Sequence, residues 1–79
     1  MPLEIRLSAS LRRLVSGYDP LRGLAMDWEP GLKVAGVLAR LCIASQDVKI
    51  IMVNGRAAGL DDPLADGDRL GLFPAVGGG

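Results

Sequence analysis

The hydrophobic period of this chain changes along its length, and this change restricts the fold more than any other feature. Apolar and polar residues alternate over residues 3–8, the period of two that is typical of a strand with one buried face. Residues 32–41 instead place apolar side chains at i, i+3, i+4 and i+7, which is one face of a helix. Strand-like aliphatic runs return at residues 48–53 and 69–73. One helix set among strands predicts an α+β fold.

Two shorter segments separate the first strand from the helix. Residues 8–15 predict a short helical turn capped by Ser8 or Ser10. Its inner side would carry Leu11, Leu14 and Val15. Apolar residues of one parity predict a second strand within residues 21–28, before Glu29-Pro30-Gly31 ends it. The helix that follows should end near Cys42 to Ser45.

The second half of the chain predicts a hairpin and a last strand. Residues 48–53 carry β-branched side chains on both parities, which indicates a central strand. Asn54-Gly55 tolerates positive φ at both central positions of a tight turn, so residues 56–58 should form a short return strand. After two further turns, Pro74 should end the strand of residues 69–73.

Composition limits both the size and the chemistry of this chain. With 79 residues it forms one domain, and its 9 basic and 9 acidic residues give no net pull toward nucleic acid or anionic lipid. One Cys and no His exclude an internal disulfide, a Ser-His-Asp triad and an ordinary zinc site. We expect Cys42 to be a core residue and the acidic residues of 61–68 to be turn formers, not metal ligands.

The N-terminus interleaves charged and apolar residues, and no apolar run is long enough to cross a bilayer. We therefore expect a cytoplasmic protein with no membrane partner. Hydrophobic residues make up 49% of the chain, although only 4% are aromatic. Because a small domain has much surface for its core, part of this aliphatic content should face outward as a partner-binding patch.

The end of the chain, Gly77-Gly78-Gly79, is its most informative motif. Glycines build no core, and the simplest interpretation is a frayed terminus. A functional interpretation requires a chain end that enters a narrow tunnel, which residues without side chains do best. The reacting group would then be the main-chain carboxylate of Gly79.

Three stretches together resemble a known family, the ubiquitin-like β-grasp sulfur carriers of the MoaD and ThiS type, over essentially the whole chain. They are Leu11-Arg12-Arg13-Leu14, the segment from Val53-Asn54-Gly55-Arg56 to Asp66-Gly67-Asp68, and the end from Phe73-Pro74 to Gly79. The Phe73-Pro74 start of the tail favours MoaD, the small subunit of molybdopterin synthase. The chain departs from the family where Ala75 replaces a common second Pro and where Gly77 replaces the usual Ala or Ser.

The resemblance implies a β-grasp domain at residues 1–74 and a flexible C-terminal tail at 75–79. Its mixed sheet of four to five strands would carry one main helix across it, with the first and last strands parallel at the centre. The resemblance also implies that Gly79 is the reacting residue. Residues Phe73, Pro74, Val76, Gly77 and Gly78 would contact partner proteins.

The resemblance further implies a sulfur carrier. A ubiquitin-activating-type enzyme would use ATP to adenylate Gly79, and a sulfur donor system would convert the adenylate to a thiocarboxylate. With the molybdopterin synthase large subunit, the chain would supply the sulfur of the molybdenum or tungsten cofactor. The chain itself would be a non-catalytic subunit or co-substrate that binds no cofactor or metal.

Three alternatives remain open at this point. The same chemistry could serve thiamine, cysteine or another sulfur metabolite. Gly79 could instead be joined to lysines, as in a ubiquitin-like protein modifier. The chain could also be an interaction module whose tail is inert.

Overall fold

A computed structural model describes residues 2–74 of the chain, apart from the side chains of residues 9 and 10. The expected tail, residues 75–79, lies outside the described part. Within the described part, no helix is both long and apolar enough to span a membrane.

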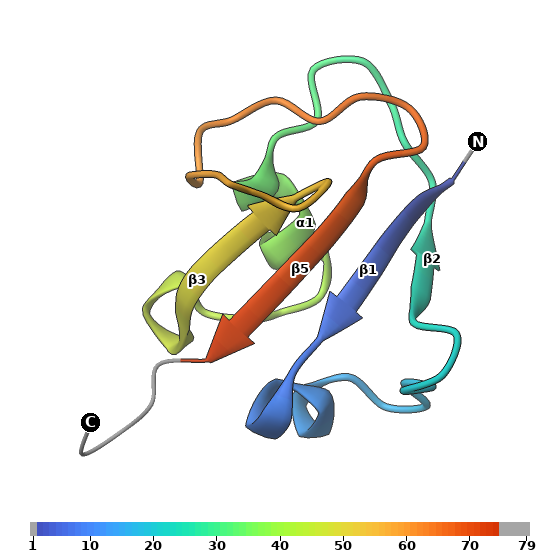
Figure 1. Ribbon diagram of the computed structural model, residues 1–79, viewed down its shortest axis with the longest axis vertical. Helices are drawn as coiled ribbons and strands as arrows, with labels where there is room; N and C mark the ends of the chain where they lie inside the picture. Colours follow the sequence, from blue (N-terminus) through green and yellow to red (C-terminus); the bar gives the residue numbers. More distant parts are fainter. Residues whose placement is uncertain (1, 75–79) are drawn as a thin grey trace.

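Five strands form one mixed sheet in the order β2-β1-β5-β3-β4 (Figure 1). The first and last strands, β1 and β5, are parallel neighbours at its centre, and the other neighbouring pairs are antiparallel. This confirms the predicted topology. The strands are β1 (Leu3–Leu7), β2 (Leu24–Met26), β3 (Val48–Val53), β4 (Arg56–Ala57) and β5 (Arg69–Pro74).

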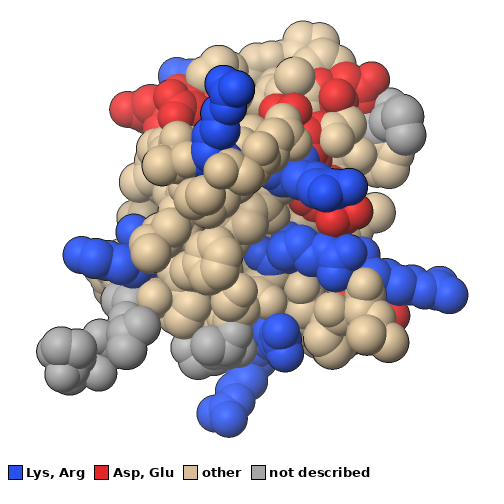
Figure 2. All heavy atoms as spheres, viewed as in Figure 1, with Lys and Arg blue, Asp and Glu red and all other residues tan. Residues whose placement is uncertain are grey.

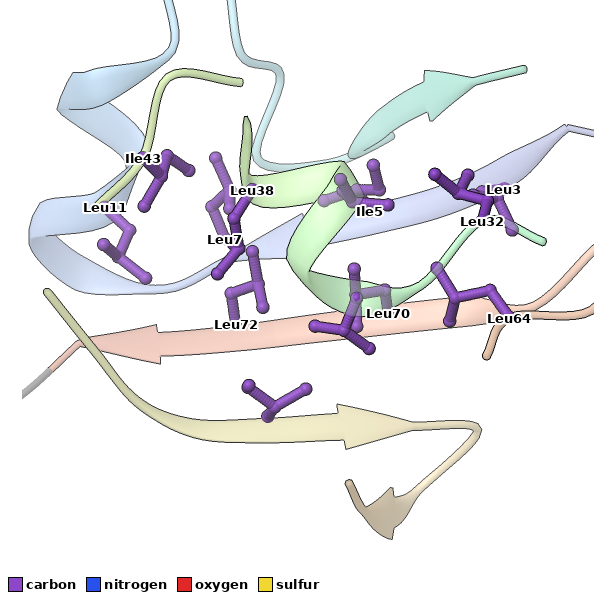
Figure 3. Close-up of a cluster of buried hydrophobic side chains, with 13 residues drawn as sticks. Leu3, Ile5, Leu7, Leu11, Leu32, Leu38, Ile43, Leu64, Leu70 and Leu72 are labelled. Carbon is purple, nitrogen blue, oxygen red and sulfur yellow. The ribbon is translucent and has the colours of Figure 1, made fainter. Parts of the chain in front are cut away.

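The helix α1 (Val34–Arg40) crosses one face of the sheet (Figure 1). There are also two short 3-10 helices: η1 (Ala9–Leu14) follows β1, and η2 (Ser45–Asp47) precedes β3. The alternation predicted for β1 is observed, with every second side chain buried. Side chains of β1, β5 and α1 meet between sheet and helix, and Figure 3 shows this cluster. The core residues are Leu3, Ile5, Leu7, Leu11, Leu32, Val34, Val37, Leu38, Ile43, Ile51, Leu64, Leu70 and Leu72.

Cys42 is exposed, so its prediction as a core residue is wrong. It follows the helix in the left-handed region, at φ 59°. The amide of Cys42 donates to the carbonyl of Ala39 (3.2 Å), and that of Ile43 donates to Leu38 (2.9 Å). These are the two hydrogen bonds of a Schellman motif, in which Cys42 occupies the position that glycine usually fills. The chain reverses there, so Ile43 enters the core while Cys42 points to solvent.

Leu14 was also predicted to face inward, but its side chain is 49% exposed, whereas Leu11 on the same element is buried. One turn of a 3-10 helix rises about 6 Å, which carries Leu14 away from the core beneath Leu11.

The face of the sheet opposite α1 is not covered by any described element. Strand β3 is flanked on both sides, by β5 and β4, but only one of its faces is buried. Its β-branched residues on both parities therefore do not mean burial on both faces: Ile51 is buried, while Ile50 is 49% exposed.

Candidate functional site

Strand β5 fixes the position of Pro74, the last residue that the structure describes. It lies between β1 and β3, and Leu70 and Leu72 on its inner face are fully buried. The amide of Ser8 donates to the carbonyl of Leu72 (3.1 Å), and this hydrogen bond joins the β1–η1 connection to the last residues of β5. The C-terminal end of β5 lies at the edge of the molecule, beside η1 (Figure 1). The residues that follow Pro74 therefore start from a well-anchored position on the surface.

Phe73 lies on the open face of the sheet, directly across from Ile50 in β3. Their side chains are 38% and 49% exposed. The next pair on this face is Met52 and Gly71. An ideal Cβ placed on Gly71 would lie 3.5 Å from Cε1 of Phe73 and 3.8 Å from Cβ of Met52, so the ring leans back over the glycine. The exposed apolar surface next to the tail is thus a cross-strand pair.

A β-bulge in β3 shapes this surface. Val48 pairs with Pro74 and Ile50 with Phe73, which leaves Lys49 as the extra residue. An extra residue changes the side to which the next side chain points. The bulge lets Val48 pack against the core while Ile50 faces outward, and it leaves Lys49 exposed at the rim.

Basic residues border the tail end of the sheet. Lys49 comes from the bulge, and Arg12 and Arg13 come from η1, which packs beside β5. Arg12 Nε donates to the carbonyl of Leu7 (3.1 Å), and none of these three side chains forms an ion pair within residues 2–74. The other basic residues of the open face, Arg6 and Arg69, both pair with Glu4 (3.0 and 3.8 Å).

Two of the acidic residues of 61–68, Asp62 and Asp68, form turns through side-chain hydrogen bonds, as predicted. Asp62 Oδ2 accepts from the Gly59 amide (2.8 Å), and Asp68 Oδ2 accepts from the Ala65 amide (2.7 Å). Asp68 Oδ1 also accepts from the side-chain amide of Asn54 (2.8 Å). Among the described residues, no three side chains of the metal-binding types lie together.

The structure places two of the predicted partner-contact residues, Phe73 and Pro74, at the end of β5. The other four candidate residues, Val76, Gly77, Gly78 and Gly79, lie outside the described residues. Ile50 and Lys49 were not predicted as part of this surface. The β-branched residues on both parities of β3 were the available signal for Ile50, but they were interpreted only as the sign of a central strand.

The strand order, with parallel β1 and β5 at the centre and one helix across the sheet, defines a ubiquitin-like β-grasp domain. Its exposed apolar pair, Ile50 and Phe73, lies on the open face of the sheet near Pro74. The sequence assigns the chain further: the ThiS family matches residues 5–79, and the chain belongs to this family. None of the curated proteins matches the chain by sequence.

Several solved structures are similar over the whole chain. SAMP1 from Haloferax volcanii is 27% identical with a TM-score of 0.73, and the match covers 100% of both chains. The HVO 2177 protein of the same organism is 26% identical with a TM-score of 0.75, over 100% of this chain and 87% of that one. A Pyrococcus furiosus protein, assigned provisionally as molybdopterin converting factor subunit 1, is 22% identical with a TM-score of 0.71, over 96% and 99%. At that identity the last match supports the fold alone.

Proposed function

We propose that this protein is a sulfur carrier whose C-terminal carboxylate, on Gly79, is activated and converted to a thiocarboxylate. The observation that carries the proposal is the position at which strand β5 ends, before the glycine end of the sequence. β5 is a central strand that ends at the molecular edge, and its residue Phe73 is exposed. In the sequence, only two residues separate the end of this strand from the three glycines. A member of the ThiS family with this arrangement can offer its terminal carboxylate to an enzyme while its folded domain is held outside.

Each step of this conversion requires a partner protein that supplies the other reactant. A ubiquitin-activating-type enzyme binds ATP, and an oxygen of the Gly79 carboxylate attacks the α-phosphate as pyrophosphate leaves. The carboxylate becomes a mixed anhydride with AMP, which is a good electrophile. A persulfide of the sulfur donor displaces AMP, and a second thiol reduces the acyl disulfide formed. The products are the thiocarboxylate and a disulfide on the partner.

The pathway that we propose is molybdopterin synthesis, with the large subunit of molybdopterin synthase as the second partner. The Phe73-Pro74 start of the tail resembles MoaD. The fold is shared with the Pyrococcus furiosus protein assigned as a molybdopterin converting factor subunit. In this role the chain is a co-substrate in the cytoplasm, and ATP is bound by its activating partner. Thiamine, cysteine or another sulfur metabolite are the alternative destinations of the sulfur.

A second function, attachment of Gly79 to lysines of other proteins, is supported by a different observation. The chain matches SAMP1 over 100% of both sequences, and SAMP1 is described as a small archaeal modifier protein. Both functions begin with the same adenylate, so they differ only in whether sulfur or a lysine amine displaces AMP.

Mass spectrometry of the chain purified from its native host separates these functions. Replacement of one oxygen by sulfur adds about 16 Da, and we expect this species, which alkylation of the thiocarboxylate should remove. Peptides carrying a branched glycine on lysine would establish the modifier function instead. If the host yields neither species, the interaction module with an inert tail is the correct function.

The pathway is tested by deleting the gene in that host. Loss of molybdenum or tungsten enzyme activity, with growth restored by the wild-type chain but not by a chain lacking Gly78 and Gly79, would support the proposal. A requirement for thiamine or cysteine would show that the sulfur goes elsewhere.

A further inference from the structure

We propose that the surface around the tail exit recognises a protein partner whose own surface is an apolar pocket rimmed by carboxylates. We call this surface the tail-end patch and define it by Ile50, Phe73, Lys49, Arg12 and Arg13. The inference rests on the proposed function for the identity of that partner, which is the adenylating enzyme. The acidic character of the partner is argued from this chain alone.

The apolar centre of the patch is preorganised. Ile50 and Phe73 are paired across two strands of the same sheet, and Phe73 leans over Gly71 instead of extending into solvent. Neither side chain needs to be ordered by the partner, so binding loses little conformational entropy there. An aromatic ring and a β-branched neighbour on a rigid strand are typical of the anchor of a protein interface.

The charges of the patch are all of one sign and are not neutralised internally. Lys49, Arg12 and Arg13 form no ion pair within residues 2–74. Three other cations of the described part also form none, but they lie toward the opposite end of the sheet: Arg22, Lys33 and Arg56. Asp47 of η2 is the acidic residue nearest to Lys49 in sequence, and no ion pair joins them. A partner with carboxylates at its rim would supply the counter-charges that the described part of this domain does not.

The acidic residues of the molecule lie mainly away from the tail-end patch. The long connection before β5, at the end of the sheet opposite Pro74, contains Asp61, Asp62, Asp66 and Asp68. On the face shown in Figure 2, most acidic side chains lie in the upper half together with several basic ones, whereas the side chains that border the lower apolar region are mainly basic. A chain with no net charge thus carries an excess of basic residues around Pro74, and a field of this kind orients that end of the domain toward an acidic partner during encounter.

Nucleic acid and anionic lipid also attract basic residues, but the patch fits a protein better. Phosphate-directed binding usually uses about 6–10 cationic contacts, and its affinity depends on them almost entirely. This patch has only three cations, and its exposed apolar pair would gain nothing from phosphates. The acidic end of a second copy of this chain is the remaining alternative.

The test measures association of the full chain with the adenylating enzyme of the same organism at about 0.1 and 1 M salt, between which the Debye length falls from about 10 to about 3 Å. Lys49→Glu and Arg13→Glu should each lower the association rate by about threefold or more at low salt, with little effect at high salt. Lys33→Glu, the same charge change before α1, is the matched control and should leave the rate almost unchanged. Phe73→Ala should instead raise the dissociation rate at both salt concentrations.

An equal effect of Lys33→Glu would overturn the inference, because it would mean that only net charge matters. Salt-independent association would overturn it as well. The inference would also be overturned if a 20-base-pair DNA duplex or phosphatidylserine vesicles bound the chain more tightly than the enzyme does. Salt-sensitive self-association of the chain in sedimentation would overturn it too. ATP–pyrophosphate exchange, followed in parallel, keeps the two proposals separate. Binding without exchange would contradict the proposed function, while the charge variants would still decide the nature of the surface.

Discussion

At the scale of single residues, Cys42 shows how backbone geometry overrides side-chain preference. A free cysteine is usually buried, yet here the left-handed position after α1 directs it to solvent. A residue with a Cβ at this φ costs roughly 1–2 kcal/mol more than in an ordinary conformation, and glycine avoids that cost.

We therefore expect Cys42→Gly to raise the free energy of unfolding by about 0.5–1 kcal/mol, the relief of strain being partly offset by the entropy of glycine in the unfolded chain. Cys42→Val should lower it, because β-branching makes the left-handed region still less favourable. Urea unfolding measures both changes. In addition, a disulfide reagent should label Cys42 in the folded wild type without denaturant, and protection of the thiol would contradict the exposed position.

Phe73 illustrates the opposite case, an aromatic residue that the fold leaves partly outside. Its exposure of 38% means that truncation leaves no closed cavity. We expect Phe73→Ala to cost about 1–2 kcal/mol of stability, below the roughly 3–5 kcal/mol typical of a core phenylalanine. Leu72→Ala, one residue earlier and fully buried, should cost about 2–5 kcal/mol and serves as the comparison. If thermal unfolding ranks the two variants in the reverse order, Phe73 is structural and the tail-end patch is misplaced.

At the scale of elements, the side chain of Asn54 adds to the backbone pairing that joins the β3–β4 hairpin to the start of β5. Asn54 and Gly55 have φ of 53° and 81°, as the sequence predicted for a tight turn with positive φ at both positions. The Asn54 side chain donates to Asp68 (2.8 Å) and accepts from the Arg69 amide (3.0 Å). The turn therefore does more than reverse the chain, because it also holds the strand that carries the tail.

Asn54→Ala should destabilise the protein by about 1–2 kcal/mol, since it removes both hydrogen bonds and places alanine at positive φ. Asn54→Gly removes the same bonds but suits the backbone, so it should recover part of the loss. Chemical denaturation of the two variants separates the contributions. Equal stability of Asn54→Gly and wild type would show that the side-chain bonds contribute nothing.

At the scale of the whole molecule, the proposed chemistry separates stability from activity. Every strand and helix of the described part ends at or before Pro74. One residue added after Gly79, or deletion of Gly78 and Gly79, should therefore change stability by no more than about 0.5 kcal/mol. Activation should nevertheless be lost, because an extended residue moves the carboxylate by about 3.3 Å, and a misplacement of about 1 Å can cost on the order of a hundredfold in rate.

ATP–pyrophosphate exchange with the adenylating enzyme measures this loss, with unfolding curves as the control for the fold. Deletion of Gly79 alone restores the di-glycine length usual in the family. Full activity of that variant would show that the third glycine is dispensable, and its inactivity would assign the reaction to Gly79. An extended chain that is still adenylated and thiocarboxylated without trimming would contradict the mechanism.

By itself, the sequence determined the elements and the fold that they form. Period-two alternation in β1, the helical period of α1 and the Asn54-Gly55 turn are local patterns, and the structure follows each of them. The motifs at its end also indicated the family to which the chain belongs. Local patterns suffice here because each element buries a single face.

For side chains that no local pattern distinguishes, only the tertiary structure decided which of them lie outside the core. The bulge at Lys49 exposes Ile50, the Schellman turn exposes Cys42, and the path of η1 exposes Leu14. Each outcome depends on how one element meets another, since burial is a property of the neighbours and not of the residue. The surface beside the tail exit, where β5, β3 and η1 converge, is therefore a product of the folded chain.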